Sequence, residues 1–392
     1  MATLLEFRDT CSNCPPASNL EDIGLKRKLR RKKVVRRGRP DHSQLLRRVF
    51  QLVFVLLNVW IGTTFYAWVR ALESGTHNRS MKRPAGVEGW LPIAGLMNFK
   101  YWVATGRLPA SHPASMFLLV AFLAIAFLFR KAFCSWLCPV GTLSEYLGQV
   151  GRRMLRRNFR LPRWLDINLR SLKYGLLGFF VWAVANMSGS DIAEFMRTPY
   201  GAVVDVRMLN FFRYLGQTAV IVLGILVLAS MLVQNFWCRY VCPYGALLGL
   251  TSLPSPLRIR RSPDACIDCA KCAKVCPSSL PVDKLITIKS AECTGCLECV
   301  ACCPAEGALQ MSLPVMKRSQ KSRRLPAWAM AVGIAALFLG IVGYAKAAGQ
   351  SNGDVPDYVY RQLVPHTNEV GHPATSSFGT IKNTACSAAP RE

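Results

Sequence analysis

Two runs of closely spaced cysteines between residues 266 and 304 carry the clearest chemistry in this chain. Each run reads C-x2-C-x2-C-x3-C-P, and the two runs follow one another directly along the chain. An iron–sulfur cubane needs four thiolates, and this spacing supplies three from one loop and the fourth, before proline, from the other run. The pattern predicts two 4Fe–4S clusters, the first on Cys266, Cys269, Cys272 and Cys303 and the second on Cys293, Cys296, Cys299 and Cys276.

A zinc-ribbon-like site or a set of disulfides is the alternative for these cysteines. Zinc usually takes paired C-x2-C knuckles rather than triplets followed by a proline-marked fourth cysteine. The clusters are favoured because the whole pattern occurs twice. One surplus thiol, Cys302, lies beside Cys303 and is either a neighbour or a rival ligand.

A second cysteine pattern, also duplicated, lies nearer the N-terminus. Residues 133–141 and 237–245 both read aromatic-Cys-x-aromatic-x-Cys-Pro-x-Gly, with thiols at Cys134, Cys138, Cys238 and Cys242. Cysteines four residues apart are expected on one face of a helix, and the proline and glycine let the chain leave it just past the second thiol. The duplication favours a shared role over inert buried thiols. A soft-metal site, a redox-active dithiol and ligation of another cluster all remain open.

The elements that position these cysteines are predicted to be membrane helices. Five long runs without charged residues occur at 49–69, 108–129, 174–190, 214–238 and 325–345. Each is close to the ~20 residues that a helix needs to cross the hydrocarbon core. Buried helices of a large soluble protein are the alternative, but five such runs favour a polytopic membrane protein. The expected fold is mainly α, with about five transmembrane helices that include a duplicated two-helix unit, and with a small two-cluster ferredoxin-like α+β domain.

The chain is predicted to have five parts. Residues 1–48 are a basic N-terminal tail, and residues 49–250 are a four-helix membrane domain with both C-x3-C-P motifs. Residues 251–325 are the ferredoxin domain, 326–346 a fifth transmembrane helix and 347–392 a short outer tail.

The net charge of +27 raises the question of nucleic acid, but the basic residues follow the expected topology instead. With the N-terminus inside and five alternating helices, the inner segments hold 35 Lys and Arg residues and the outer segments hold 12. This asymmetry is typical of the positive-inside rule, so the nearest partner of the charge is anionic lipid and no nucleic-acid partner is expected. The ferredoxin domain then falls on the cytoplasmic side, where a reducing environment keeps ligand thiols free of disulfides.

Several cofactor classes find no support in the sequence. None of the histidines (His42, His77, His112, His366 and His372) lies deep in an apolar run, so a bis-histidine haem inside the membrane is excluded. Motifs for covalent haem, flavin, nicotinamide or nucleotide binding are absent from the sequence. The remaining pair, Cys11 and Cys14, reads as two unligated thiols in the tail rather than a metal pair. The outer segment at 89–102, with Trp90 and nearby His112, is a candidate site for a quinol headgroup.

The two C-x3-C-P motifs at helix ends, followed by the two ferredoxin runs, resemble the NapH/NosR/CcoG group of membrane-bound polyferredoxins, which includes the MauN-like ferredoxins. The segment 266–304 alone resembles the bacterial-type two-cluster ferredoxin domain. The chain differs from particular members: it lacks the outer flavin domain of the nitrous-oxide type and adds a fifth span relative to the nitrate type.

The resemblance implies an electron carrier of the bacterial cytoplasmic (inner) membrane. Such a protein would pass electrons between a quinol pool or cytoplasmic donor and a periplasmic redox enzyme system, as a subunit of a quinol dehydrogenase. Its expected partners are membrane lipid, redox proteins in the membrane or periplasm, and quinol. The alternative function is maturation of a copper metalloenzyme, in which the four membrane cysteines would hold or reduce the metal.

Overall fold

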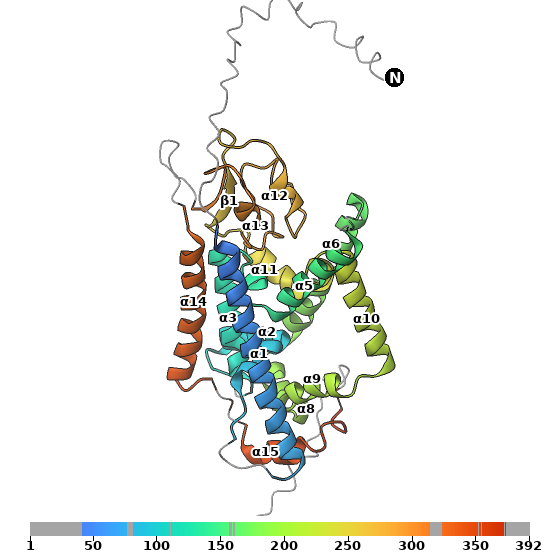
Figure 1. Ribbon diagram of the computed structural model, residues 1–392. Coiled ribbons are helices and arrows are strands. Elements are labelled where there is room, and N and C mark those ends of the chain that lie inside the picture. Colours follow the sequence, from blue (N-terminus) through green and yellow to red (C-terminus); the bar gives the residue numbers. More distant parts are fainter. Residues whose placement is uncertain are drawn as a thin grey trace, which may run out of the picture.

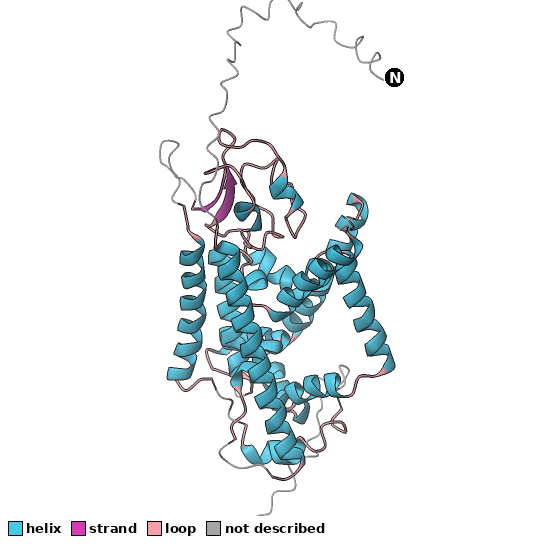
Figure 2. Cartoon of the chain, in the orientation of Figure 1, coloured by secondary structure: helices cyan, strands magenta, loops and turns pink. Residues whose placement is uncertain are grey.

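The computed structural model describes residues 41–373, apart from 77–80, 110, 157–158, 160, 314–323, 352, 354 and 372. Most of the basic tail, Cys11, Cys14, His77 and His372 therefore lie outside the described residues. Helices dominate the described part, with one two-stranded sheet, as Figure 2 shows. The mainly α fold with a small ferredoxin-like domain is confirmed.

The helices of the membrane part and the outer end are α1 (Ser43–Glu73), η2 (Ala85–Trp90), α2 (Pro92–Thr105), α3 (Pro113–Phe129), α4 (Phe133–Trp136), α5 (Pro139–Leu155), α6 (Arg163–Asn186), α7 (Gly189–Arg197), α8 (Pro199–Ala202), α9 (Val204–Arg213), α10 (Gln217–Leu232), η3 (Trp237–Val241), α11 (Pro243–Thr251), α14 (Ala327–Ala347) and α15 (Asp357–Leu363). The ferredoxin block contains β1 (Arg258–Arg261), α12 (Lys271–Lys274), α13 (Glu298–Ala301) and β2 (Leu309–Ser312).

All five expected spans contain a helix, but only some are long enough to cross a membrane alone. By length and composition, α1 and α14 qualify in the described part of the chain. Two further pairs qualify only together, α6 with α7 and α9 with α10, and these pairs bend by 99° and 81°. The described chain thus has two to four candidate spans. The helix α3 is apolar but has only 17 residues.

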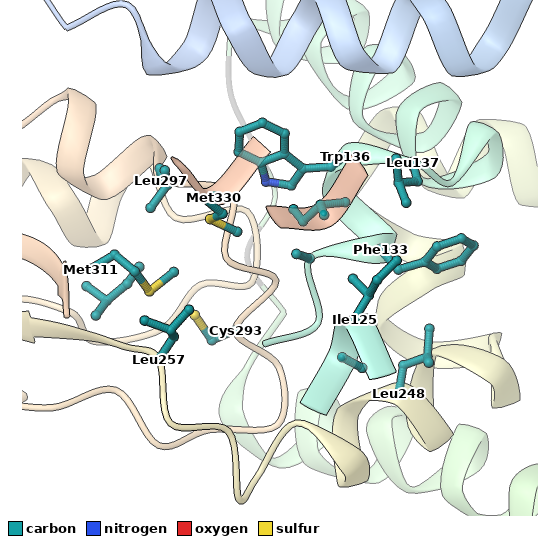
Figure 3. Close-up of a cluster of buried hydrophobic side chains, with 14 of the residues drawn as sticks. Ile125, Phe133, Trp136, Leu137, Leu248, Leu257, Cys293, Leu297, Met311 and Met330 are labelled. Atoms are coloured by element: carbon teal, nitrogen blue, oxygen red, sulfur yellow. The ribbon is translucent and has the colours of Figure 1, made fainter. Parts of the chain in front are cut away.

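The helix α3 is apolar on every side because it lies inside the bundle. Its neighbours include α2, α11 and α14, and ten of its side chains are buried. A helix that is hydrophobic all round is typically a buried one. The buried side chains around α3 continue into the ferredoxin block. Trp136 of α4, Met330 of α14 and Cys293 of the ferredoxin block belong to one cluster of buried side chains (Figure 3).

The helix α10 shows the opposite pattern. Only Ser230 of its sixteen residues is buried, while Ile221, Ile225 and Leu228 expose about 60% of their surface. The helices α1, α6 and α14 also expose large apolar side chains. Contiguous apolar surface of this extent marks a membrane or protein interaction face, and it fits a membrane protein.

The ferredoxin block lies at the end of the bundle where α1 and α14 begin (Figure 1). Its strands β1 and β2 pair antiparallel, with Ile259 opposite Met311. Both side chains are buried, so this face of the sheet packs onto the core beneath it. At the far end of the bundle, α15 packs on α1 through an edge-to-face contact of Trp68 and Tyr360, with ring centroids 5.3 Å apart.

Candidate functional site

Cysteines of both ferredoxin runs line one cavity near the surface of the block. The thiol-bearing residues of this first cysteine cavity are Cys266, Cys269, Cys272 and Cys303. Three come from the first run and the fourth comes from the second run, after α13 has ended. The structure therefore brings together the four residues that the sequence groups as the first ligand set.

A second cavity, nearer the membrane helices, is lined by the other crossed set: Cys276, Cys293, Cys296 and Cys299. Apolar side chains complete its wall, among them Leu280, Val282 and Ile288. Three of these four cysteines are buried, whereas Cys269 of the first cavity is exposed. The first cysteine cavity thus has one cysteine, Cys269, at the protein surface, whereas the second has none.

The same backbone conformation recurs in both triplets. In the first, Asp268 and Ala270 flank the middle cysteine with φ of 54° and 55°; in the second, Gly295 and Leu297 do so with φ of 63° and 60°. Each left-handed residue before the short helix, α12 or α13, lets the loop fold back so that all three thiols face one side. Positive φ is costly for residues other than glycine, and such geometry is typical of functional sites.

The surplus thiol Cys302 belongs to neither ligand set. It is not among the described residues that line the two cavities, and its thiol donates to the carbonyl oxygen of Cys299 at 3.5 Å. Of the two roles that the sequence leaves open, its position is that of a neighbour rather than a ligand.

The loop that carries the second cysteine cavity docks onto the membrane helices through its backbone. Three consecutive carbonyl oxygens accept side-chain hydrogen bonds: Thr294 from Ser135 at 2.7 Å, Gly295 from Trp136 at 3.3 Å and Cys296 from Gln44 at 3.0 Å. Two of the donors lie between Cys134 and Cys138. The first C-x3-C-P motif and the ferredoxin loop are thus in direct contact.

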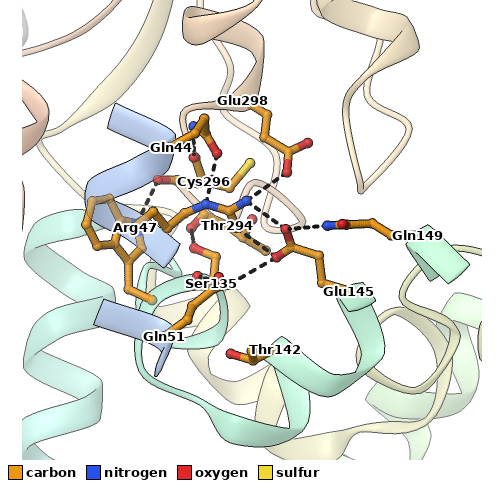
Figure 4. A network of polar contacts seen from close by, with 12 residues as sticks. Gln44, Arg47, Gln51, Ser135, Thr142, Glu145, Gln149, Thr294, Cys296 and Glu298 are labelled. Carbon is orange, nitrogen blue, oxygen red and sulfur yellow. Dashed lines mark hydrogen bonds and ion pairs between the residues drawn. The ribbon is translucent and has the colours of Figure 1, made fainter. Parts of the chain in front are cut away.

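A buried ion-pair network strengthens the same junction (Figure 4). Arg47 of α1 donates to both carboxylate oxygens of Glu145 at 2.7 Å, and to Glu298 at 2.8 Å. Glu298 opens α13, between Cys296 and Cys299. One guanidinium therefore joins α1, α5 and the ferredoxin loop, and a paired guanidinium of this kind is costly to unpair.

The duplicated C-x3-C-P motifs repeat their hydrogen bonds as well as their sequence. The second cysteine of each motif donates its N–H five residues back, Cys138 to Phe133 at 2.9 Å and Cys242 to Trp237 at 3.0 Å. Each of these cysteines is the N-cap of the next helix and is followed by proline at the first helical position. Its sulfur accepts an N–H three residues later, from Gly141 at 3.5 Å and Gly245 at 3.2 Å.

This geometry corrects two expectations about the motifs. The spans do not run straight into them, because α3 ends at Phe129, α10 ends at Leu232, and Arg130 and Asn235 then adopt positive φ. The paired thiols also do not share one face of an α-helix. The five-residue hydrogen bond is of the π type, which is frequent at functional sites.

The four thiols, here called the thiol quartet (Cys134, Cys138, Cys238 and Cys242), come together from both halves of the repeat. Cys238 interacts electrostatically with the other three, and Cys134 with Cys138 and Cys242. Burial raises the pKa of the Cys134 thiol to about 12 and of the Cys138 thiol to about 11. As free thiols these two would be protonated and unreactive at neutral pH.

A polar cavity, here called the bridging cavity, connects the thiol quartet with the second cysteine cavity. Its lining includes Cys134 and Cys238, the first thiol of each motif, together with Cys296 of the ferredoxin loop. Arg47, Lys131, Glu145 and Glu292 also contribute to its wall. Two thiols of the quartet and one of the second ferredoxin set therefore line the same cavity.

A buried lysine from the first half of the repeat reaches the second half. Lys131 is only 2% exposed, and its Nζ lies 3.5 Å from where a Cβ on Gly245 would be. Burial acts to lower the pKa of Lys131, but Cys134, Glu292 and the thiols of the second motif outweigh it and hold the pKa above its ordinary value. The raised pKa of Lys131 thus depends on negative charge on these thiols and on Glu292.

A second buried lysine faces the same carboxylate. Lys173 of α6 has no exposed surface and contacts both oxygens of Glu292 at 2.6 and 2.7 Å. Tyr174 donates its hydroxyl to the same carboxylate at 3.1 Å. Glu292 precedes Cys293, so this ion pair joins α6 to the ferredoxin loop.

The quinol-headgroup hypothesis for His112 is not supported by its surroundings. His112 is 2% exposed; its Nδ1 lies 2.9 Å from the Arg83 guanidinium and its Nε2 lies 2.8 Å from the Gly201 carbonyl oxygen. Because guanidinium only donates, Nδ1 accepts and the Nε2 proton goes to Gly201. Both ring nitrogens are thus engaged within the protein, in a network with Glu88 and Asp205.

The sequence pattern located every cysteine of these sites but none of the charged residues between them. Arg47, Lys131, Lys173 and Glu292 resemble ordinary basic or acidic residues near helix ends, and only the assembled fold buries them. Among the described residues, no three His, Cys, Asp or Glu side chains are arranged to hold a single metal ion.

Comparison with known proteins agrees with this division of the chain. A family model described as "4Fe-4S binding domain" matches twice, over residues 111–162 and 215–261, and so covers each C-x3-C-P motif once. A second family model, "4Fe-4S dicluster domain", matches residues 258–304. No solved structure matches the chain.

Curated relatives carry related names. A protein of Escherichia coli called "Putative electron transport protein YccM" is 48% identical over 326 residues, which cover 83% of this chain and 91% of that protein. The "Ferredoxin-type protein NapH" of Escherichia coli is 25% identical, covering 59% of this chain and 74% of its own length. The "Protein NirI" of Paracoccus denitrificans is 31% identical over 41% of this chain but only 23% of its own length.

Proposed function

Because this chain belongs to the NapH/NosR-like family of iron–sulfur polyferredoxins, we propose that it transfers electrons at a membrane through two 4Fe–4S clusters. The first cluster is held by Cys266, Cys269, Cys272 and Cys303, and the second by Cys276, Cys293, Cys296 and Cys299. When bound, such clusters take up and release single electrons.

The observation that carries this proposal is the crossed lining of the two cysteine cavities. Each cavity gathers three thiols of one run and the proline-marked fourth thiol of the other. Four soft thiolate donors around a compact space are the ligand set that a cubane requires. The residues present therefore fit the group.

The surrounding residues hold and tune the thiolates. The backbone N–H of Asp268 donates to the sulfur of Cys266, and that of Leu280 to the sulfur of Cys276, both at 3.4 Å. Hydrogen bonds to ligand sulfurs and the degree of burial set the reduction potential of such sites. Since Cys269 is exposed and Cys296 is buried, the first site is the one open to a soluble partner.

The second site lies on the way to the membrane part. Its loop is held on α4 by Ser135 and Trp136, and it shares the bridging cavity with the thiol quartet. The thiol quartet is then the next centre on the path, and the exposed apolar faces of α1, α6, α10 and α14 contact lipid. Quinol or a cytoplasmic donor at one end and a periplasmic redox protein at the other complete the proposed path.

The orientation follows from the charge distribution. The ferredoxin block and the start of α1 share one end of the bundle, next to the most basic segments of the sequence. The positive-inside rule assigns that end to the cytoplasm. We propose a bacterial inner membrane protein with the ferredoxin block in the cytoplasm, where thiols remain reduced.

The experiment is a metal count on anaerobically purified full-length protein in detergent. Two clusters require about eight irons and about eight sulfides per chain. The Cys302→Ser variant is the matched control, because its thiol lies beside the sites without lining them, and it should keep the full complement. Little iron with bound zinc instead would overturn the proposal. Reduction of the clusters by duroquinol would support quinol as the donor; bound copper that Cys134→Ser removes would favour the maturation function.

A further inference from the structure

We infer that the thiol quartet (Cys134, Cys138, Cys238 and Cys242) is the ligand set of a third iron–sulfur cluster, shared between the two halves of the repeat. This inference rests on the proposed function, in which the thiol quartet is the next centre on the electron path, and it names the group that the quartet would hold. The family models describe domains and assign no ligands there. Each half of the repeat supplies two thiols, so neither half is a complete site.

The two C-x3-C-P motifs have the same local geometry. In each, the second cysteine caps a helix, donates its N–H five residues back and accepts an N–H from the glycine three residues on. An N–H that donates to sulfur favours the thiolate form, as in other metal-bound cysteines. Cysteines that only fill a hydrophobic core do not require these hydrogen bonds, and here the hydrogen bonds occur in both motifs.

The two halves of the repeat also lie close together. Lys131, three residues before Cys134, lies against Gly245 of the other motif and interacts with Cys238 and Cys242. Within the first motif, Gly141 lets α5 approach closely, because a Cβ there would lie 2.2 Å from the Cys134 carbonyl oxygen. The two motifs therefore lie against each other, and the first thiol of each lines one cavity.

The positive charge around the thiol quartet also favours an anionic group there. Lys131 and Lys173 are both buried, and one carboxylate, Glu292, lies between them. Arg239, inside the second motif, is paired with the Asp166 carboxylate at 2.8 Å. A buried cation beside thiols favours their thiolate form. Four thiolates on an iron–sulfur core carry net negative charge and would balance it.

Position distinguishes this cluster from an isolated metal site. Cys134 and Cys238 line the same cavity as Cys296, a proposed ligand of the second ferredoxin cluster. A redox centre at the quartet would therefore lie directly beyond the second cluster, between it and the membrane helices. Among the described residues, no three His, Cys, Asp or Glu side chains are arranged for a single ion.

The test uses full-length protein purified anaerobically in detergent. A third 4Fe–4S cluster brings the total to about twelve irons per chain, against about eight without it. Cys134→Ser and Cys238→Ser, one from each half, should both lose the same cluster, about four irons, and should leave the electron paramagnetic resonance signals of the ferredoxin clusters in place. Cys302→Ser should keep all of the iron.

The outcomes separate the two proposals. About eight irons in the wild type, unchanged in Cys134→Ser and Cys238→Ser, would overturn the third cluster and leave the ferredoxin clusters standing. Stoichiometric copper at the quartet, or four thiols that react with a maleimide in the folded protein, would also overturn it. Absence of iron altogether would remove the proposed function itself. Retained ferredoxin signals in each variant show that it has folded.

Discussion

The indole N–H of Trp136 donates to the carbonyl oxygen of Gly295 at 3.3 Å. Trp136 lies between the two thiols of the first C-x3-C-P motif, and Gly295 lies between two thiols of the second ferredoxin run. Two cysteine patterns in which these residues are 159 positions apart are therefore joined directly, by this hydrogen bond and by that of Ser135 to Thr294. The relationship brings the membrane motif and the ferredoxin block into direct contact, as the proposed electron path requires.

Replacing Trp136 by phenylalanine should weaken this junction. The variant keeps an aromatic ring in a fully buried position but loses the donor, at a cost of about 1 kcal/mol for the hydrogen bond and somewhat more for the lost volume. Thermal unfolding in detergent should show a lower Tm. Trp182→Phe, on an exposed face of α6, is the control and should leave the Tm unchanged. Equal effects of the two substitutions would show that the junction is not specific.

Removing the Arg47 guanidinium should destabilise the fold strongly. Arg47→Met leaves Glu145 and Glu298 buried without their cation, a loss of about 3–5 kcal/mol. The double variant Arg47→Met/Glu145→Gln should recover part of this loss, because one of the two unpaired charges is then gone. The measurement is a double-mutant cycle from unfolding midpoints. Strictly additive effects would contradict a coupled pair.

The two motif glycines should respond differently to alanine. At Gly141 a Cβ would meet the Cys134 carbonyl oxygen at 2.2 Å, whereas at Gly245 the nearest atoms lie at 3.5 Å. Gly141→Ala should therefore cost about 1–3 kcal/mol, and Gly245→Ala should stay within about 0.5 kcal/mol. Iron content and Tm should both fall in the first variant only. A reversed order would contradict the geometry of the motif.

Lys131 should raise the reduction potential of a centre at the thiol quartet. A buried positive charge favours the reduced, more negative state, so Lys131→Met should lower that potential while Lys131→Arg should largely keep it. By Coulomb's law, a unit charge held within about 7 Å of any redox centre contributes about 2 kcal/mol or more at an effective dielectric constant of ~20, on the order of 100 mV. Redox titration of the signal that Cys134→Ser removes measures the shift. An unchanged potential in Lys131→Met would exclude this role.

The cysteine spacing was sufficient to group the ferredoxin thiols, because ligation chemistry restricts which thiols can meet. The five apolar runs likewise predicted where helices occur, since burial or lipid contact requires uncharged stretches of that length. The bends after α6 and before α10, and the shortness of α3, depend on packing partners and are not contained in local composition. The π-type turns of the motifs were not predicted, for the same reason. A spacing of four residues suggests an α-helix, and only the structure shows that the second cysteine of each motif is the N-cap of the helix that begins at the next proline.

The charged residues of the site were beyond the sequence pattern. Lys131 counts among the basic residues next to a span, where the positive-inside rule accounts for it. Only the assembled structure shows that it is buried against Gly245 of the other repeat, with Glu292 and Lys173 beside it. Such residues have no fixed spacing from the thiols they serve, so no motif could reveal them.

The crossed ligand sets are tested most directly by removing one proline-marked thiol at a time. Electron paramagnetic resonance of reduced protein should show that Cys303→Ser alters the same signal as Cys269→Ser, and that Cys276→Ser alters the same signal as Cys296→Ser. These pairs combine thiols of different runs, as the two cysteine cavities do. If Cys303→Ser instead altered the signal that depends on Cys296, each run would hold its own cluster and the account would be contradicted.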